Sequence, residues 1–193
     1  MKKLISCTLL CLPLALGTAL SGCVPAIIGA GAVAATGVAQ DRGLEQGVDD
    51  NEISLEIGRK LLAENQDLYA RTATLVRKGR VMLIGYMGNP QDKARVEAIA
   101  RTVGGITSIR NELLVGDPLT FSEKTSDTVI STKLRTALFG DGSVSSINYS
   151  IRVLRSIVYI TGTAMTQAEL DGVIAHARDV SGVHGVVSDI EVK

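Results

Sequence analysis

Apolar and polar positions in the second half of the chain follow two periodicities in turn, helical and alternating. Ile130, Leu134 and Leu138 recur at helical spacing after Asp127, a residue type that caps helix starts. Strict alternation follows from Ile147 onward, which is typical of strands. The predicted elements are a helix capped by Asp127, hairpin strands over 147–153 and 158–160, a helix with a capping box from Thr166 to Glu169, and a closing strand over 186–192.

The first half repeats this order of elements. Residues 48–116 align without a gap with residues 125–193, at an offset of about 77 residues and with about thirteen identities. In the first copy the second helix is predicted over 90–103, with Asn89 as its cap, and the closing strand over 109–115. We therefore expect an α+β fold with two domains, 48–116 and 125–193, joined by a connector over 117–124. Each domain would place two helices on one face of a three-stranded sheet.

One position in the hairpin turn differs between the copies. The first copy has Gly79, and the second has Ser156. Because glycine adopts positive φ angles at little cost, we expect the second hairpin to be altered.

The N-terminus has the three parts of a secretory signal peptide. Lys2 and Lys3 precede an apolar stretch over 4–16, and the segment ends in Leu20-Ser21-Gly22-Cys23. This layout resembles the bacterial lipobox, which implies removal of residues 1–22 and acylation of Cys23, with palmitate among the chains. Val24 follows where inner-membrane retention signals usually have Asp, so the resemblance implies the outer membrane, facing the periplasm. An ordinary cleaved signal with an incidental cysteine is the alternative.

The segment after Cys23 is predicted to be a linker, over residues 23–47. Residues 24–39 are uncharged and rich in Gly and Ala, but about sixteen residues fall short of the roughly 20 that span a bilayer. A spanning helix formed together with an uncleaved signal is the alternative. The formal net charge is zero, and about −2 once Lys2 and Lys3 are removed, which argues against a nucleic-acid partner. Because the other two cysteines lie in the signal, no disulfide or cysteine metal site is expected.

Short motifs recur in both copies and resemble those of the BON domain. They are Asp-x-x-Ile at Asp50 and Asp127, Val-x-(Leu/Ile)-x-Gly at 81–85 and 158–162, and Val-x-Gly-(Ile/Val) at 103–106 and 180–183. Together with the lipobox, they make the chain similar to the dual BON-domain outer-membrane lipoproteins of Gram-negative bacteria. The resemblance implies phospholipid binding by the second domain, support of outer-membrane integrity and enrichment at division sites.

Residues suited to catalysis are few. His176 and His184 are the only histidines, and their separation across a helix stop fits no standard ligand spacing. Asp49, Asp50 and Glu52 are expected to cap and charge a helix start, with metal binding as the minor alternative. We therefore expect no catalytic site, no cofactor and no metal, and a protein that is not an enzyme.

The first helices of the two copies differ in charge. Glu52 and Glu56 make the first one acidic, whereas the second has Lys133 and Arg135. Helical spacing directs one set of side chains outward from the first helix of the second copy, where cations flank apolar side chains. Such a surface suits an anionic bilayer, because the cations meet phosphates and the apolar tips enter the acyl boundary. The predicted phospholipid-binding residues are Val129, Thr132, Lys133, Arg135, Thr136 and Phe139. The partners would be anionic phospholipids, phosphatidylglycerol or cardiolipin, with the membrane also held by the N-terminal acyl chains.

Two alternatives remain open for this helix. Phe139 could turn inward at the helix end, and Val129 could be an ordinary exposed apolar residue. The alternative function is that of a protein adaptor for an outer-membrane assembly or cell-wall factor, in which lipid serves only as the anchor.

Overall fold

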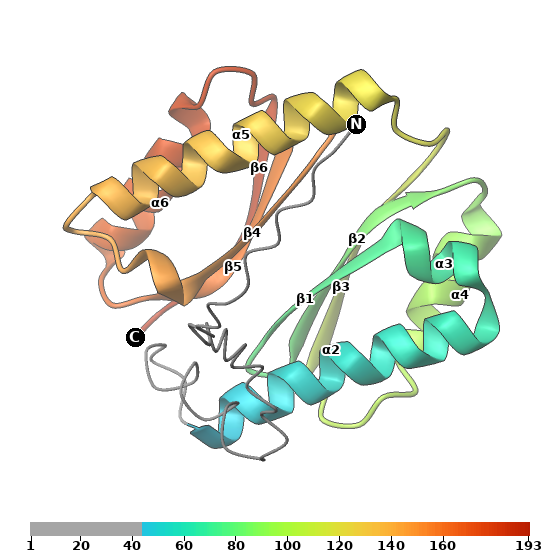
Figure 1. Cartoon of the computed structure of the whole chain (residues 1–193). Coiled ribbons are helices and arrows are strands. Elements are labelled where there is room, and N and C mark those ends of the chain that lie inside the picture. Colours follow the sequence, from blue (N-terminus) through green and yellow to red (C-terminus); the bar gives the residue numbers. More distant parts are fainter. Residues whose placement is uncertain (1–43) are drawn as a thin grey trace, which may run out of the picture. The chain divides into compact units, whose positions relative to one another are not determined.

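Each half of the described chain folds into a three-stranded sheet with its two long helices on one face, which confirms the predicted α+β class (Figure 1). The computed structural model describes the backbone of residues 44–193 and the side chains of residues 50–193. The predicted signal peptide, Cys23 and most of the predicted linker lie outside the described residues.

The first domain consists of α2 (Leu44–Glu64), α3 (Gln66–Arg71), β1 (Thr72–Arg77), β2 (Arg80–Met87), α4 (Pro90–Ala100) and β3 (Ser108–Val115). The second consists of α5 (Phe121–Gly140), a short 3-10 helix η1 (Ser146–Asn148), β4 (Tyr149–Leu154), β5 (Ile157–Ala164), α6 (Gln167–Asp179) and β6 (Gly185–Val192). In both sheets the hairpin strands are antiparallel, and the closing strand pairs in parallel with the central one. The predicted hairpins and closing strands are thus present.

The central strands β2 and β5 are buried along nearly their whole length. Their side chains alternate between two apolar layers. Val81 and Leu83 join the core beneath the helices of their own domain, whereas Met82 and Ile84 point to the opposite face. On that opposite face they pack in one cluster with Tyr159 of β5. The two sheets therefore bury their helix-free faces against each other.

Charged side chains border this cluster. The Arg77 Nε donates to Thr163 Oγ1 at 3.1 Å, and Arg80 pairs with Asp189 at 3.4 Å and also with Glu191. The hydrogen bond from Lys78, together with the neighbouring positive charges, outweighs burial and lowers the pKa of Glu191. The bordering charges thus link the first hairpin to the last strand of the chain.

The structure corrects three predicted boundaries. The helix expected over 90–103 ends at Ala100, with a turn before Gly104. Helix α5 begins at Phe121, inside the predicted connector. Residues 146–148 form η1 rather than the start of a strand, and α3 has no predicted counterpart. Both missed helices are shorter than two turns, too short for a helical periodicity to emerge.

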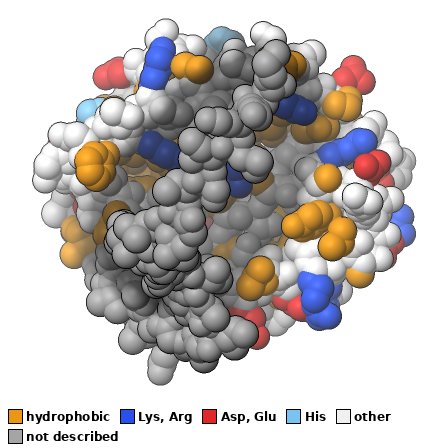
Figure 2. Space-filling view, in the orientation of Figure 1, with side chains coloured by type: hydrophobic (Ala, Val, Ile, Leu, Met, Phe, Trp, Pro, Cys, Tyr) orange, Lys and Arg blue, Asp and Glu red, His pale blue; other side chains and the backbone are white. Residues whose placement is uncertain are grey.

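The described surface carries apolar side chains among the polar ones (Figure 2). The most exposed large ones are Phe121, Phe139 and Leu55. Within the described residues, no helix is both long and apolar enough to cross a bilayer.

Candidate functional site

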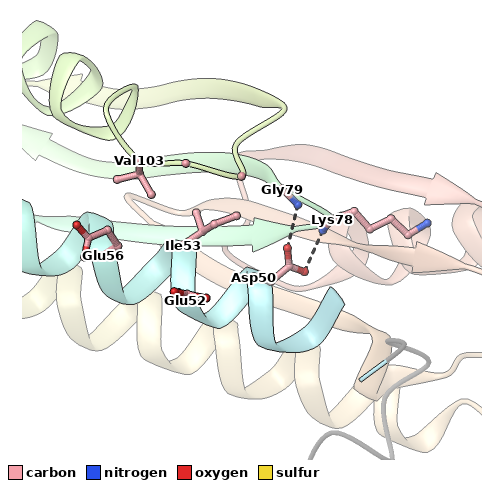
Figure 3. Close-up of a pocket in the computed structure, with 9 residues that line it drawn as sticks. Asp50, Glu52, Ile53, Glu56, Lys78, Gly79 and Val103 are labelled. Atoms are coloured by element: carbon pink, nitrogen blue, oxygen red, sulfur yellow. Dashed lines mark hydrogen bonds between the residues drawn. The ribbon is translucent and has the colours of Figure 1, made fainter. Parts of the chain in front are cut away.

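A buried aspartate in the first helix of the first domain holds the turn of its hairpin. The Asp50 carboxylate accepts hydrogen bonds from the backbone amides of Lys78 and Gly79, each at 2.9 Å (Figure 3). Asp50 lies inside α2 and is buried, so the expectation that it caps or charges the helix start is wrong. The side chain of Asp49 lies outside the described residues, and Glu52 is exposed beside the cavity that Figure 3 shows.

The second domain repeats this arrangement. The Asp127 carboxylate accepts from the backbone amides of Arg155 and Ser156 at 2.9 and 2.8 Å. The prediction that Asp127 caps the helix is also wrong, because it is a buried interior residue of α5. Asp, Ser and Asn often cap helices, so the local sequence pattern favours a cap at this position. In the structure the Asp127 carboxylate instead accepts hydrogen bonds from amides 28 and 29 positions away.

The second hairpin turn keeps the geometry of the first despite its serine. Both central residues have positive φ in each turn, 51° and 73° at Lys78 and Gly79 and 50° and 63° at Arg155 and Ser156. The expected alteration is therefore wrong. Two hydrogen bonds from the turn to Asp127 help hold Ser156 in a left-handed conformation that serine seldom adopts. Gly79 is required for a different reason, because a Cβ there would lie 2.5 Å from the carbonyl oxygen of Gly105.

The true cap of α5 is Thr120. Its side chain accepts from the Glu123 amide at 3.2 Å, and the Glu123 carboxylate accepts from the Thr120 amide at 2.7 Å, which is a capping box. Hydrogen bonds from the Thr120 backbone and hydroxyl lower the pKa of Glu123. The capping box adds almost two turns to the helix before Asp127.

The six predicted phospholipid-binding residues all lie on the exposed side of α5. The Phe139 ring is 84% exposed and Val129 is 45% exposed. Thr132, Lys133 and Thr136 are exposed as well. Ile130, Leu134 and Leu138 point the other way into the core. The ring of Phe139 therefore does not turn inward.

Arg135 differs from the others in having a fixed partner. Its guanidinium donates to the backbone carbonyl of Ile151 in the edge strand β4, at 3.0 Å. Beside it, a groove of about 410 Å³ runs between the end of α5 and β4. Phe139, Ile147 and Ile151 line the groove, so its walls are mainly apolar.

The extra turns of α5 add residues to this face that the sequence reasoning missed. They are Phe121, Lys124, Thr125 and Thr128, all exposed. The signal that could have found them is the pattern Thr120-x-x-Glu123, which is a capping box in sequence as well as in structure. We name the outward side chains of α5 the α5 outer face: Phe121, Lys124, Thr125, Thr128, Val129, Thr132, Lys133, Arg135, Thr136 and Phe139.

The histidines take no part in this face. His176 Nε2 lies 2.7 Å from the Asp141 carboxylate. Hydrogen bonds from Ser143 and His176 lower the pKa of Asp141 to about 2. His184 is exposed in the loop just before β6. No group of three or more metal-ligating side chains occurs in the described part of the chain.

A buried carboxylate on α6 serves the fold of the same domain. Glu169 accepts from the backbone amides of Ser145 and Met165 at 2.9 and 2.7 Å. Burial alone would raise the pKa of Glu169, but these hydrogen bonds outweigh it, and the pKa is lowered. Glu169 thus connects the loop after α5 with the start of α6.

Both halves of the chain match the family model described as BON domain, over residues 49–117 and 126–193. The two matches cover more than half of the sequence, so the chain belongs to the BON-domain family. The resemblance that the repeated motifs indicated is confirmed.

Individual relatives indicate which kind of BON-domain protein this chain resembles. The chain is 29% identical over 169 residues to Outer membrane lipoprotein DolP of Haemophilus influenzae, and the alignment covers 87% of each protein. It is 29% identical over 147 residues to an uncharacterized protein of Anaplasma centrale, covering 76% of this chain and 96% of that one. It is also 26% identical to Osmotically-inducible protein Y of Escherichia coli, covering 76% and 74%. The chain is thus a DolP-like protein with two BON domains.

The buried carboxylate of the second domain is testable through stability. Replacing Asp127 by Asn leaves one acceptor oxygen for two buried amides, so we expect the free energy of unfolding to fall by about 2 kcal/mol. The measurement is the urea midpoint followed by circular dichroism, at unchanged m value. Asp179→Asn, on the exposed end of α6, is the matched control and should leave the midpoint in place. Equal midpoints for the two variants would contradict the assignment.

The two turns predict opposite effects of exchanging glycine and serine. A serine in the left-handed conformation costs about 1 kcal/mol or more, and Ser156→Gly removes this cost. The glycine also increases the entropy of the unfolded chain, so we expect the free energy of unfolding to rise by roughly 0.5 kcal/mol. Gly79→Ser should destabilise by about 2 kcal/mol or more, because its Cβ would meet the Gly105 carbonyl. Thermal unfolding of both variants tests this, and a loss of stability in Ser156→Gly would refute the strain argument.

Proposed function

We propose that this envelope-associated BON protein binds anionic phospholipid through the α5 outer face, while acyl chains on Cys23 hold it at the outer membrane. In this role it supports outer-membrane integrity, including at division sites. Its similarity to Outer membrane lipoprotein DolP supports the location. The exposed apolar and cationic character of the α5 outer face supports the lipid contact.

The observation that carries the proposal is the placement of the two phenylalanines. The chain has two Phe and no Trp, and both Phe lie on α5. Phe121 is 86% exposed and Phe139 is 84% exposed. They are eighteen residues apart, which is five full turns, so both project from the same side of the helix about 27 Å from each other. A helix with one aromatic ring at each end of one side is suited to lying flat on a membrane surface.

Between the two rings, the threonine hydroxyls are already hydrogen-bonded. Thr125, Thr128, Thr132 and Thr136 each donate their hydroxyl to the backbone carbonyl four residues earlier, at 2.8 to 2.9 Å. Burying a hydroxyl without a partner would cost free energy, but these donors keep theirs when the helix enters an apolar layer. The threonines therefore do not oppose shallow insertion.

Lys124, Lys133 and Arg135 are the exposed charged side chains of α5, whereas Glu123 is half-buried and Asp127 is buried. Both acidic side chains accept hydrogen bonds, Glu123 in the capping box of α5 and Asp127 from the hairpin turn. Lys124 and Lys133 are exposed on opposite flanks of the helix, and neither forms an ion pair within the described residues. Juxtamembrane cations gain about 1 kcal/mol each near an anionic surface, so this face should prefer anionic headgroups.

We further propose that the protein acts by binding, without catalysis. Its histidines support this, since His176 is engaged with Asp141 and His184 lies apart from it in the loop just before β6. A binding role is also consistent with the small, open grooves beside the α5 outer face.

Charge reversal on α5 tests the lipid contact. In the chain without residues 1–22 and with Cys23→Ser, Lys124→Glu with Lys133→Glu should weaken binding to phosphatidylglycerol vesicles at least tenfold, because two attractions become repulsions. Vesicle flotation is the measurement. The control carries the same change of net charge on the second helices, Lys93→Glu with Arg178→Glu, and should bind as before. If both double variants float alike, the α5 outer face is not the lipid contact.

A further inference from the structure

A groove between the first helix and the first strand occurs at the same place in both domains. In the second domain it lies between α5 and β4, and in the first between α2 and β1, with a volume of about 500 Å³. Most of the lining positions of the second groove correspond to lining positions of the first at the repeat offset. The corresponding pairs that matter here are Gly58 with Arg135, Leu62 with Phe139, and Thr74 with Ile151.

Among the described residues the strand β1 forms one edge of its sheet, because β2 is its only strand neighbour there. The two-residue turn closes on the pair Arg77 and Arg80, so every second residue of β1 hydrogen-bonds to β2. Thr72, Thr74 and Val76 are the residues in between. The N–H and C=O groups of Thr74 therefore point outward, into the groove that its residue lines.

The equivalent edge in the second domain is closed by a side chain. There the outward carbonyl of Ile151 accepts a hydrogen bond from the guanidinium of Arg135 at 3.0 Å. In the first domain the position of Arg135 is Gly58, which has no side chain to offer. No side chain among the described residues donates to the Thr74 carbonyl. An unprotected edge strand is a template for pairing with another strand, and proteins usually cover such edges.

The surface beside this edge is apolar. Leu55 is 75% exposed, Leu62 51% and Tyr69 47%. Leu55 and Leu62 are seven residues apart and so share one side of α2, with Gly58 between them. The Tyr69 ring approaches to 3.4 Å of where a Cβ of Gly58 would be. The groove thus has an apolar wall on the helix side and free backbone groups on the strand side.

A cation lies at the border of the groove. Arg152 of β4 lines it, is exposed, and forms no ion pair in the part of the chain that the structure describes. An acidic group on an occupant would complement this charge. A second copy of the chain would instead bring its own Arg152 to the same place, where like charges repel.

We propose that the groove between α2 and β1 binds an extended peptide segment of a partner protein, which adds to β1 as a fourth strand. One apolar side chain of the segment would lie among Leu55, Leu62 and Tyr69, and an acidic residue would lie near Arg152. Strand addition obtains affinity from main-chain hydrogen bonds and specificity from side-chain pockets, and this groove offers both. A lipid tail has no backbone donors for the Thr74 carbonyl, so the edge favours a peptide.

The test is selection from a phage-displayed library of random 12-residue peptides on the chain without residues 1–22 and with Cys23→Ser. We expect enriched sequences that alternate apolar and polar residues and contain Asp or Glu. In an NMR titration a synthetic peptide of the enriched sequence should shift the amides of Thr74 and Val76. A selection that enriches nothing, or a peptide that shifts the β4 amides instead, would overturn the proposal.

Matched variants identify the edge itself. Thr74→Pro removes an outward N–H without removing a bond to β2, and should weaken peptide binding at least tenfold. Thr74→Val keeps the N–H and should bind as the unchanged chain does. Gly58→Arg installs the counterpart of Arg135 and should also block the peptide. Circular dichroism checks that each variant is folded. Equal binding by Thr74→Pro and Thr74→Val overturns the proposal.

Two further readouts separate the other occupants. A concentration-dependent dimer that Thr74→Pro abolishes would make a second copy the occupant, and would overturn the peptide proposal. Flotation with phosphatidylglycerol vesicles should be the same for Thr74→Pro and the unchanged chain, because the lipid contact lies on α5. Loss of flotation in Thr74→Pro would make lipid the occupant of this groove. Flotation lost only in the α5 variants leaves the two sites distinct.

Discussion

The rotation of each first helix about its own axis is constrained by one buried carboxylate. Asp50 and Asp127 each accept hydrogen bonds from two backbone amides in the hairpin turn of their own domain, where both turn residues have positive φ. Rotating the helix would leave the turn amides without their hydrogen-bond acceptor, which would lower the free energy of unfolding. With Asp127 held inward, the helical repeat determines that Phe121 and Phe139 point outward. The surface proposed to bind lipid thus depends on an interaction on the far side of the helix.

Beneath their helices the two domains have equivalent apolar core positions, whereas many of their exposed positions differ. Leu83 and Ile160, or Ile57 and Leu134, occupy equivalent core places, and each sheet buries its helix-free face against the other. Each domain exposes the outer side of its first helix beside the edge formed by its first strand. In the second domain Arg135 closes the edge and the helix carries cations and phenylalanines. In the first domain Gly58 leaves the edge open beside leucines. The two domains therefore offer surfaces of different chemistry, one that we propose binds lipid and one that we propose binds a peptide.

Much of the fold could be predicted from the sequence, because alternation and helical spacing report burial directly. The hairpins, the closing strands, the second helices and the doubling of the unit all follow from such patterns, as does the outward direction of Val129 and Phe139. The patterns could not show that Asp127 accepts amides from a turn 28 residues away, since an aspartate before an apolar repeat is locally indistinguishable from a cap. That error shortened the predicted helix and concealed Phe121 and Lys124. The hydrogen bond from Arg135 to Ile151 could not be predicted for the same reason, because it joins two elements that only the fold brings together.

The central claim is that α5 lies flat on an anionic membrane, with both ends in contact. Because the chain has no tryptophan, Phe121→Trp and Phe139→Trp each give a single fluorescent reporter at one end of the helix. The measurement is quenching of each reporter by phosphatidylglycerol vesicles containing lipids brominated on the acyl chains. We expect strong and similar quenching at both positions, with none in a Leu55→Trp reporter on α2. Quenching at one end alone, at neither end, or equally at Leu55→Trp would contradict this claim.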